Sequence, residues 1–179
     1  MIDFKTCRDA SSRAETLVTE YGQRLFDTAM KFCGNRQDGE DIVFRTIERA
    51  VDRFDSFDGR SGLFSWLYAI MINFIRSDCR RKGANALTFV PEPPDSPDLS
   101  PSPDEALVAE ENAELVRTAV DGLSFPLKTV LLMRYFDDFK VPEIAEILGI
   151  PEGTVKSRLN LAKLTVRKKL SNHFPDRDV

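Results

Sequence analysis

Apolar residues recur at helical spacing along most of this chain, and no segment shows the alternation typical of a strand. Residues 11–33 give the clearest early example, with Leu17, Val18, Tyr21, Leu25, Phe26, Ala29, Met30 and Cys33 at steps of three and four. The same spacing predicts helices at about residues 38–54, 63–82, 105–122, 126–136, 141–148 and 152–170. The predicted fold class is therefore all-α.

Residues 83–104 interrupt this pattern. They contain six prolines with acidic residues between them, a composition that cannot form a packed core and predicts a semi-extended linker. The linker divides the chain into two helical modules, residues 11–82 and residues 105–172. Because each module has its own apolar faces, we expect two compact domains that fold independently.

The last two predicted helices form a helix-turn-helix. Gly149 suits the left-handed conformation that ends a helix, and Pro151 suits the start of the next one. The following helix has one apolar stripe, made by Val155, Leu159, Ala162, Val166 and Leu170. In this motif the second helix enters the major groove of DNA.

A second arc of the same helix carries side chains that contact bases and phosphates, namely Thr154, Lys156, Ser157, Arg158 and Asn160. By helical angle Leu161 lies beside Thr154 and Ser157, where its side chain would meet a thymine methyl group. The segment from Thr154 to Lys169 holds six basic residues and no acidic one. An amphipathic hairpin with a solvated basic face remains the alternative.

The helix predicted at residues 63–82 is apolar nearly all round, and its last turns are basic, with Arg76 and Arg80 among them. Aromatic residues beside a basic strip suit single-stranded nucleic acid, although core packing explains the aromatic residues equally well. On the helix at residues 38–54, Glu40 and Asp41 match the helix dipole or contact a basic partner. Phe44 lies off the apolar stripe, either at the core edge or as an exposed interface anchor.

Charge is distributed unevenly. The net charge is −4, but residues 1–82 hold 14 basic and 13 acidic side chains, residues 83–123 hold 1 and 9, and residues 124–179 hold 10 and 7. The acidity therefore belongs to the middle of the chain, and both ends are slightly basic. This placement is compatible with nucleic-acid binding at both ends.

Several classes of protein are disfavoured by the sequence. There is no apolar run long enough for a membrane span and no signal-peptide core, and the three cysteines (Cys7, Cys33 and Cys79) are widely separated. These features predict a cytoplasmic protein with reduced thiols. The sequence contains no phosphate-binding loop, metal-ligand cluster or nucleophile–histidine arrangement that would indicate an enzyme, and no cofactor is expected.

Two segments resemble a known family. The run from Phe57 to Asn73, followed by Asp78-Cys-Arg-Arg81, resembles region 2 of bacterial sigma factors. Residues 123–135, 143–150 and 153–159 resemble region 4 of the same proteins. Both regions in this order, joined by a short linker, are typical of the small extracytoplasmic-function (ECF) type of the sigma-70 family.

The resemblance implies a three-helix bundle for region 2, a helix-turn-helix domain for region 4, and a non-catalytic role. Such proteins bind core RNA polymerase, read the −10 element as a melted strand and the −35 element as duplex, and promote transcription initiation. An anti-sigma factor is a common further partner. The implied −10 contacts are Phe57, Gly59, Arg60, Ser61, Phe64 and Asn73, with Arg76 and Arg80 on the basic strip. The implied −35 contacts are Thr154, Lys156, Ser157 and Arg158. The implied polymerase-binding residues are Glu40, Asp41, Val43 and Phe44.

The sequence also departs from the family pattern. Phe44 and Arg45 stand where a glutamine and an acid are usual, and Asn160 and Leu161 stand where basic residues are common. Phe64 is expected to line the base pocket, and Trp66, about 200° further round the helix, is expected to be core. Two alternative functions stay open: a stand-alone helix-turn-helix regulator, and an interaction protein that keeps the sigma shape but sequesters a regulator.

Overall fold

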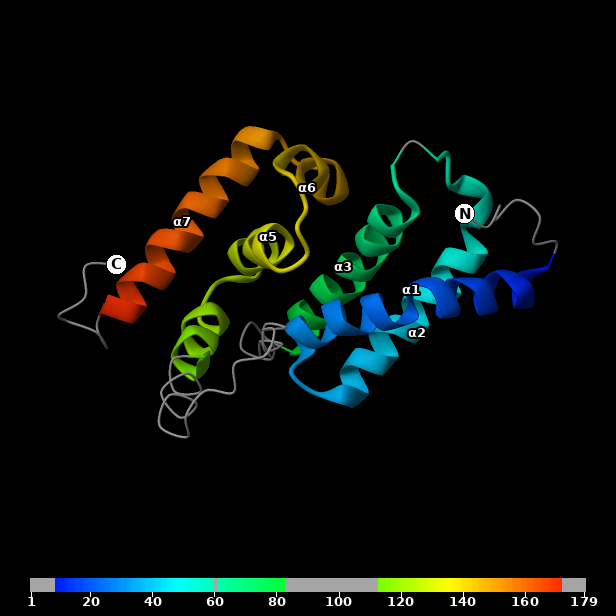
Figure 1. Cartoon of the computed structure of the whole chain (residues 1–179), viewed down its shortest axis with the longest axis horizontal. Coiled ribbons are helices and arrows are strands. Elements are labelled where there is room, and N and C mark those ends of the chain that lie inside the picture. The colour runs from blue at the N-terminus through cyan, green and yellow to red at the C-terminus, as the bar shows by residue number, and fades with distance from the viewer. Residues whose placement is uncertain (1–8, 60, 83–112, 172–179) are drawn as a thin grey trace, which may run out of the picture.

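The computed structural model describes residues 9–59, 61–82 and 113–171, and within these ranges the chain forms helices and no strand. The elements are α1 (Ala10–Cys33), α2 (Arg36–Asp52), the short η2 (Phe54–Ser56), α3 (Leu63–Lys82), α5 (Phe125–Tyr135), α6 (Val141–Leu148) and α7 (Glu152–Ser171) (Figure 1). Residues 113–121 are also helical. The all-α prediction is confirmed. The predicted linker, residues 83–104, and the start of the helix predicted at residue 105 lie outside the described residues.

The helix boundaries follow the caps. Helix α1 begins after Asp9, whose carboxylate accepts a hydrogen bond from the Ser12 N–H at 2.7 Å. Helix α2 begins two residues earlier than predicted, because Asn35 accepts from the Asp38 N–H at 2.9 Å. Such side chains satisfy amide groups that the first helical turn leaves unpaired.

The first module is a three-helix bundle of α1, α2 and α3. Its buried side chains come from the apolar stripes seen in the sequence, and they include Leu17, Leu25, Phe32, Ile42, Ile47, Leu67, Met71 and Ile75. Helix α3 is apolar on more than one face, and it lies between α1–α2 and the second module (Figure 1). One helix therefore connects the cores of both modules.

The second module contains α5, α6 and α7. Val130 and Leu132 of α5 and Ile144 of α6 are fully buried, and the predicted stripe of α7 packs on them through Val155, Leu159 and Ala162. Gly149 has a φ of 63°, which places it in the left-handed region at the end of α6, as predicted. The helix-turn-helix geometry is confirmed.

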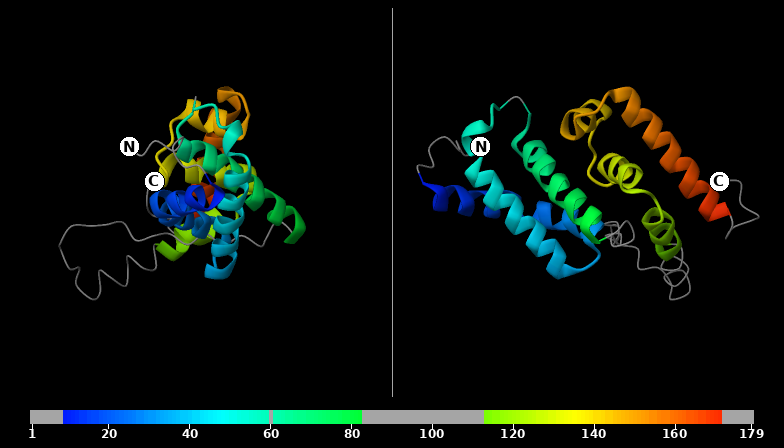
Figure 2. Two further views of the ribbon diagram at one scale, coloured as in Figure 1. Left: turned by 90° about the vertical axis from the view of Figure 1, so that its right-hand side faces the viewer. Right: turned by 180° about the vertical axis from the view of Figure 1, so that it is seen from behind.

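The two modules pack directly on each other. The rings of Phe32 on α1 and Phe125 on α5 lie 6.2 Å apart, and Phe139, in the segment between α5 and α6, contacts Phe64 and Tyr68 on α3. Buried residues of both modules form one continuous apolar cluster. The right-hand view of Figure 2, seen from behind, shows α6 beside α3. The two modules therefore share one core in this structure, and their independent folding stays a prediction.

Candidate nucleic-acid and polymerase interfaces

Helix α7 exposes one polar arc opposite its buried stripe. Lys156, Ser157, Asn160 and Leu161 are exposed, with 54% of Leu161 accessible. Thr154 is half-buried, and its carbonyl accepts a hydrogen bond from the Ser157 hydroxyl at 3.0 Å. The arc thus presents a cation, hydroxyl and amide groups and an apolar side chain together. This combination suits a mixed surface of phosphates and base edges.

Helix α3 carries the predicted basic strip on a single face. Asn73, Arg76 and Arg80 recur at steps of three and four and are all exposed. The Arg76 guanidinium donates a hydrogen bond to the Asn73 side-chain oxygen, which orients both groups. The strip therefore offers cations and an amide along about two turns of one helix.

The turn before α3 has the backbone shape expected of a close-approach site. Gly59 has a φ of 73°, a conformation that side-chain-bearing residues rarely adopt, and no atom lies within 4 Å of the place where a Cβ would stand. Phe57 and Ser61 are half-buried beside it. Arg60, also predicted for this site, lies outside the described residues.

Phe64 and Trp66 lie on different faces of α3 as predicted, but Phe64 is the buried one of the two. Phe64 is only 8% exposed: its ring stacks on Phe139 at 6.0 Å, and the Arg24 guanidinium lies 3.6 Å from the ring centroid. Trp66 is half-buried and contacts Phe57 at 5.2 Å between ring centroids. In this conformation Phe139 of the second module and Arg24 of α1 cover the Phe64 ring, and its role as a pocket wall stays a prediction. Trp66 instead packs against Phe57, the aromatic residue of the turn before α3.

The outer face of α2 bears the exposed aromatic residue that the sequence left open. Phe44 is 68% exposed, so it does not lie at the core edge. Glu40 pairs with Arg36 at 2.7 Å, and Val43 is half-buried. Asp41 pairs at 3.0 Å with Arg45, which also reaches Asp78 on α3 at 2.8 Å.

Arg45 joins α2 to α3. Hydrogen bonding to Asp78 raises the pKa of the guanidinium further, and its carbon lies 4.6 Å from the Phe74 ring centroid. The departure from the family pattern at this position therefore has a structural role: Arg45 replaces an acid of the outer face by a cation that links two helices.

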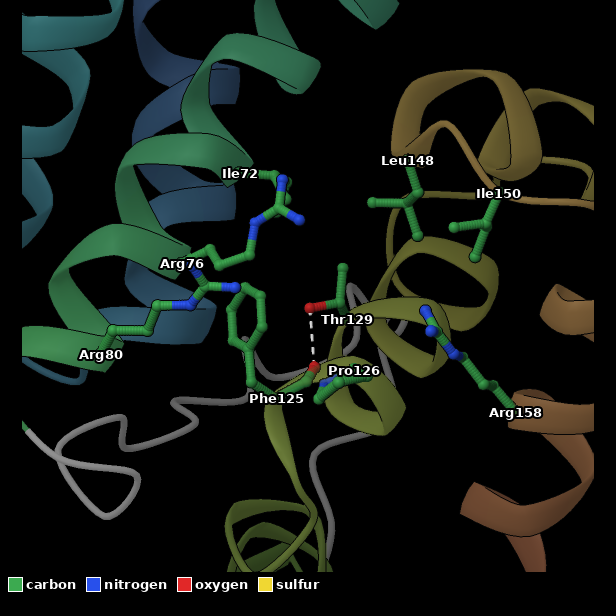
Figure 3. A pocket seen from close by; sticks show the side chains of 9 residues that line it. All are labelled: Ile72, Arg76, Arg80, Phe125, Pro126, Thr129, Leu148, Ile150 and Arg158. Carbon is green, nitrogen blue, oxygen red and sulfur yellow. Dashed lines mark hydrogen bonds between the residues drawn. The ribbon is translucent and has the colours of Figure 1, made fainter.

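A cavity of about 260 Å³ lies between the modules. Its apolar wall combines residues of α3, α5 and the helix-turn-helix, namely Ile72, Phe125, Pro126, Leu148 and Ile150, with Thr129 also lining it. Arg76 and Arg80 extend into it from α3 and Arg158 from α7, on opposite sides (Figure 3). No acidic side chain is among the residues that line it. Residues predicted to contact the −10 and the −35 elements thus face one cavity.

A buried polar cluster between the modules was missed by the sequence analysis. Asp137 accepts hydrogen bonds from Lys31 at 2.9 Å, from Tyr68 at 2.8 Å and from Thr28 at 3.3 Å. The Lys31 and Asp137 side chains are only 9% and 6% exposed. One signal was present: Lys31 interrupts an apolar segment of α1 on the face that packs inward. Its partner is 106 residues away, which no local pattern reveals.

Among the described residues, no group of histidine, cysteine and acidic side chains is suited to a metal ion. None of the helices in that part of the chain is long and apolar enough to cross a membrane.

Comparison with known proteins identifies the family. Residues 17–85 match the family described as Sigma-70 region 2, and residues 113–166 match Sigma-70, region 4. The ECF RNA polymerase sigma factor EcfG of Rhodopseudomonas palustris is 31% identical over 90% of this chain and 83% of its own. The ECF sigma factor SigW of Bacillus subtilis is 29% identical over 86% of this chain and 87% of its own.

Two solved structures share the fold. The structure of CnrH in complex with the cytosolic domain of CnrY aligns with a TM-score of 0.66 at 20% identity, over 92% of this chain and 91% of that one. The sigma factor RpoE of Bartonella quintana, in complex with the anti-sigma factor NepR, aligns with a TM-score of 0.64 at 23% identity, over 91% and 98%. This chain belongs to the ECF sigma factors of the sigma-70 family.

Proposed function

We propose that this sigma factor binds core RNA polymerase through the outer face of α2, the −10 element through the residue 57–61 turn and α3, and the −35 element through α7. The observation that carries the proposal is the division of α7 into two faces. Val155, Leu159 and Ala162 are buried against α5 and α6, while Lys156, Ser157, Asn160 and Leu161 are exposed. A helix held in this way presents a rigid, side-chain-rich edge that fits a major groove.

The −10 assignment rests on a different kind of surface. Exposed cations on α3, a half-buried Phe57 ring and the open backbone at Gly59 suit an unstacked base and its phosphates. We assign residues 11–82 to polymerase and −10 binding and residues 105–172 to −35 binding. Two structurally similar sigma factors are in complexes with CnrY and the anti-sigma factor NepR, and we expect a comparable inhibitory partner here.

Reconstituted transcription tests the function. Runoff transcription with core polymerase on a genomic promoter library should yield products that depend on this chain. A stand-alone helix-turn-helix regulator would bind DNA but give no such products, and an interaction protein that only sequesters a regulator would give neither.

Two substitutions test the −35 assignment. Lys156→Ala and Arg158→Ala should each weaken binding of the selected −35 duplex. A loss of about 1–3 kcal/mol with relaxed preference at one position indicates a base contact. A uniform loss with a shallower salt dependence indicates a phosphate contact. Glu146→Ala, a substitution of an exposed residue on α6, serves as the control. If neither arginine nor lysine substitution changes binding, α7 does not enter the groove.

A further inference from the structure

The cavity of about 260 Å³ has cationic side chains on two opposite sides. Arg76 and Arg80 extend into it from α3, and Arg158 extends into it from α7 (Figure 3). Arg76 is oriented by its hydrogen bond to Asn73, and neither Arg80 nor Arg158 has an acidic partner in the part of the chain that the structure describes. Charges of one sign around a hollow reinforce each other's field. The cavity is therefore suited to an anionic ligand.

Between these charges the cavity wall is apolar. It is made by Ile72, Phe125, Pro126, Leu148 and Ile150. The Phe125 ring also contacts Phe32 of α1, with centroids 6.2 Å apart, which restricts its movement. Small-molecule sites commonly combine such an apolar wall with a few polar groups that fix the ligand's orientation. The ligand that fits here has an apolar or aromatic body as well as a negative charge.

Thr129 narrows the chemistry further. Figure 3 shows its side chain between the arginines of the two sides. The Thr129 hydroxyl donates its proton to the Phe125 carbonyl at 2.8 Å, so its oxygen can only accept a hydrogen bond from a ligand. A ligand group that faces Thr129 therefore gains a hydrogen bond if it is an O–H or N–H donor, as sugar hydroxyls and base amino groups are.

The start of α5 adds to the positive potential of the cavity. Phe125 and Pro126 are the first two residues of this helix, both line the cavity, and the first turn holds no acidic residue. The positive end of the helix dipole thus lies on the same side as the arginines' target. A phosphate monoester carries about −1.5 to −2 charges at pH 7, whereas a carboxylate carries one, and guanidinium groups bind phosphate oxygens in pairs. Phosphate is therefore the anion that this cavity favours.

We propose that the cavity is a binding site for a mononucleotide, whose phosphate is held by the arginines, whose base packs on Phe125 and whose hydroxyl or amino group donates to Thr129. Ligand sites usually measure about 300–1,000 Å³, so a cavity of about 260 Å³ takes one nucleotide and excludes larger ones. The inference goes beyond the proposed function. Because the same arginines are assigned to promoter contacts, a bound nucleotide would compete with promoter DNA for them.

Isothermal titration calorimetry on the full chain, without DNA or polymerase, tests the site. The probes are the 5′-monophosphates of adenosine, guanosine, cytidine and uridine, together with adenosine, which lacks the phosphate, and inorganic phosphate, which lacks the base. We expect at least one mononucleotide to bind at a single site with a Kd below about 1 mM. Adenosine and inorganic phosphate should each bind about tenfold more weakly or not at all, because each retains only part of the contacts.

Substitution of the arginines tests the position of the phosphate. Arg80→Gln and Arg158→Gln should each raise the Kd for the mononucleotide about tenfold, as expected for the loss of a charged hydrogen-bonding group. Arg81→Gln is the matched control, since it removes the same charge one position along α3. The Arg81 side chain is 71% exposed, pairs with Asp78 at 2.8 Å and does not line the cavity. This variant should bind the mononucleotide like the unaltered chain.

Substitution of Thr129 tests the hydrogen bond to the ligand. Thr129→Val keeps the branched shape and removes the acceptor, so it should weaken mononucleotide binding about threefold to tenfold and leave binding of inorganic phosphate unchanged. Thr129→Ser keeps the hydroxyl and should bind the mononucleotide like the unaltered chain. Thr129 is 2% exposed and is assigned to no promoter contact, so this pair separates a nucleotide site from a DNA-binding surface.

Four results would overturn the proposal. They are the absence of mononucleotide binding below about 1 mM, binding that survives both Arg80→Gln and Arg158→Gln, an equal loss in Arg81→Gln, and inorganic phosphate binding as tightly as the mononucleotides. Circular dichroism verifies that each variant remains helical. If an arginine variant unfolds, Thr129→Val decides, and unchanged mononucleotide binding in that variant rejects the site. A negative result leaves the promoter assignments intact, and an absence of runoff products leaves the nucleotide site intact.

Discussion

Phe44 offers the sharpest test of how this sigma factor meets polymerase. Its ring is 68% exposed in the free chain. A phenylalanine buries about 150–250 Å² when fully covered, so docking on α2 would remove about 140 Å² of apolar surface. At about 25 cal/mol per Å² this burial is worth ~3.4 kcal/mol, an upper value because ordering and desolvation offset part of it.

The expected result of Phe44→Ala is a loss of about 2–3 kcal/mol in polymerase affinity, equivalent to about a 30- to 150-fold higher Kd. Competition with a labelled sigma factor for core polymerase, followed by fluorescence anisotropy, measures this change. The melting temperature should not fall, because a largely exposed side chain contributes little to folding. Val18→Ala removes an apolar residue that is 53% exposed on a different helix, α1, and is the matched control. A Kd for Phe44→Ala within about twofold of the unaltered chain would refute the assignment of α2 as the docking face.

Two further predictions concern side chains of α3. Burial raises the pKa of the Cys79 thiol to about 11 from its ordinary 9.0, so the folded chain keeps the proton that the unfolded chain releases first. This difference in pKa stabilises the folded chain fully below pH 9, and about 2–3 kcal/mol of unfolding free energy is lost as the pH rises to 11. Urea unfolding should show this extra alkaline loss in the unaltered chain and not in Cys79→Ala. Trp66→Ala should lower the unfolding free energy by about 3 kcal/mol, near the low end for large aromatic truncations because Trp66 is half-buried. Trp66→Ala should also weaken binding of single-stranded −10 DNA, because the Phe57 ring loses its contact with the indole. Normal binding by this variant would exclude the idea that Trp66 supports Phe57.

The local sequence pattern was sufficient to predict the helices and the helix-turn-helix. The stripe of Val155, Leu159 and Ala162 and the left-handed Gly149 depend on residues within a few positions of each other, so periodicity and turn chemistry predict them. Helix start points were less accurate, because several capping residues compete near each start. The Asn35 cap places the start of α2 two residues before the predicted start.

Packing between modules was not predictable in the same way. The segment Phe136-Asp-Asp-Phe139 reads as a polar turn, and nothing within it distinguishes the buried Asp137 from the exposed Asp138. Helical angle correctly separates Phe64 from Trp66, but which face is covered depends on Phe139, which is 75 positions from Phe64 in the chain and adjacent to it in space. Tertiary contacts of this length therefore decided the exposure of a predicted site residue.

The placement of the three cavity arginines also affects how the free protein behaves among genomic DNA. The chain has a net charge of −4, while Arg76, Arg80 and Arg158 gather around one cavity between the modules. Charges farther apart than a Debye length of about 8 Å at physiological salt are largely screened, so an approaching duplex responds to the local charge of the face that it meets and only weakly to the net charge. A duplex is therefore attracted where these arginines gather and is repelled where acidic side chains stand. Charge placement, more than net charge, then determines which face of the free molecule meets non-promoter DNA.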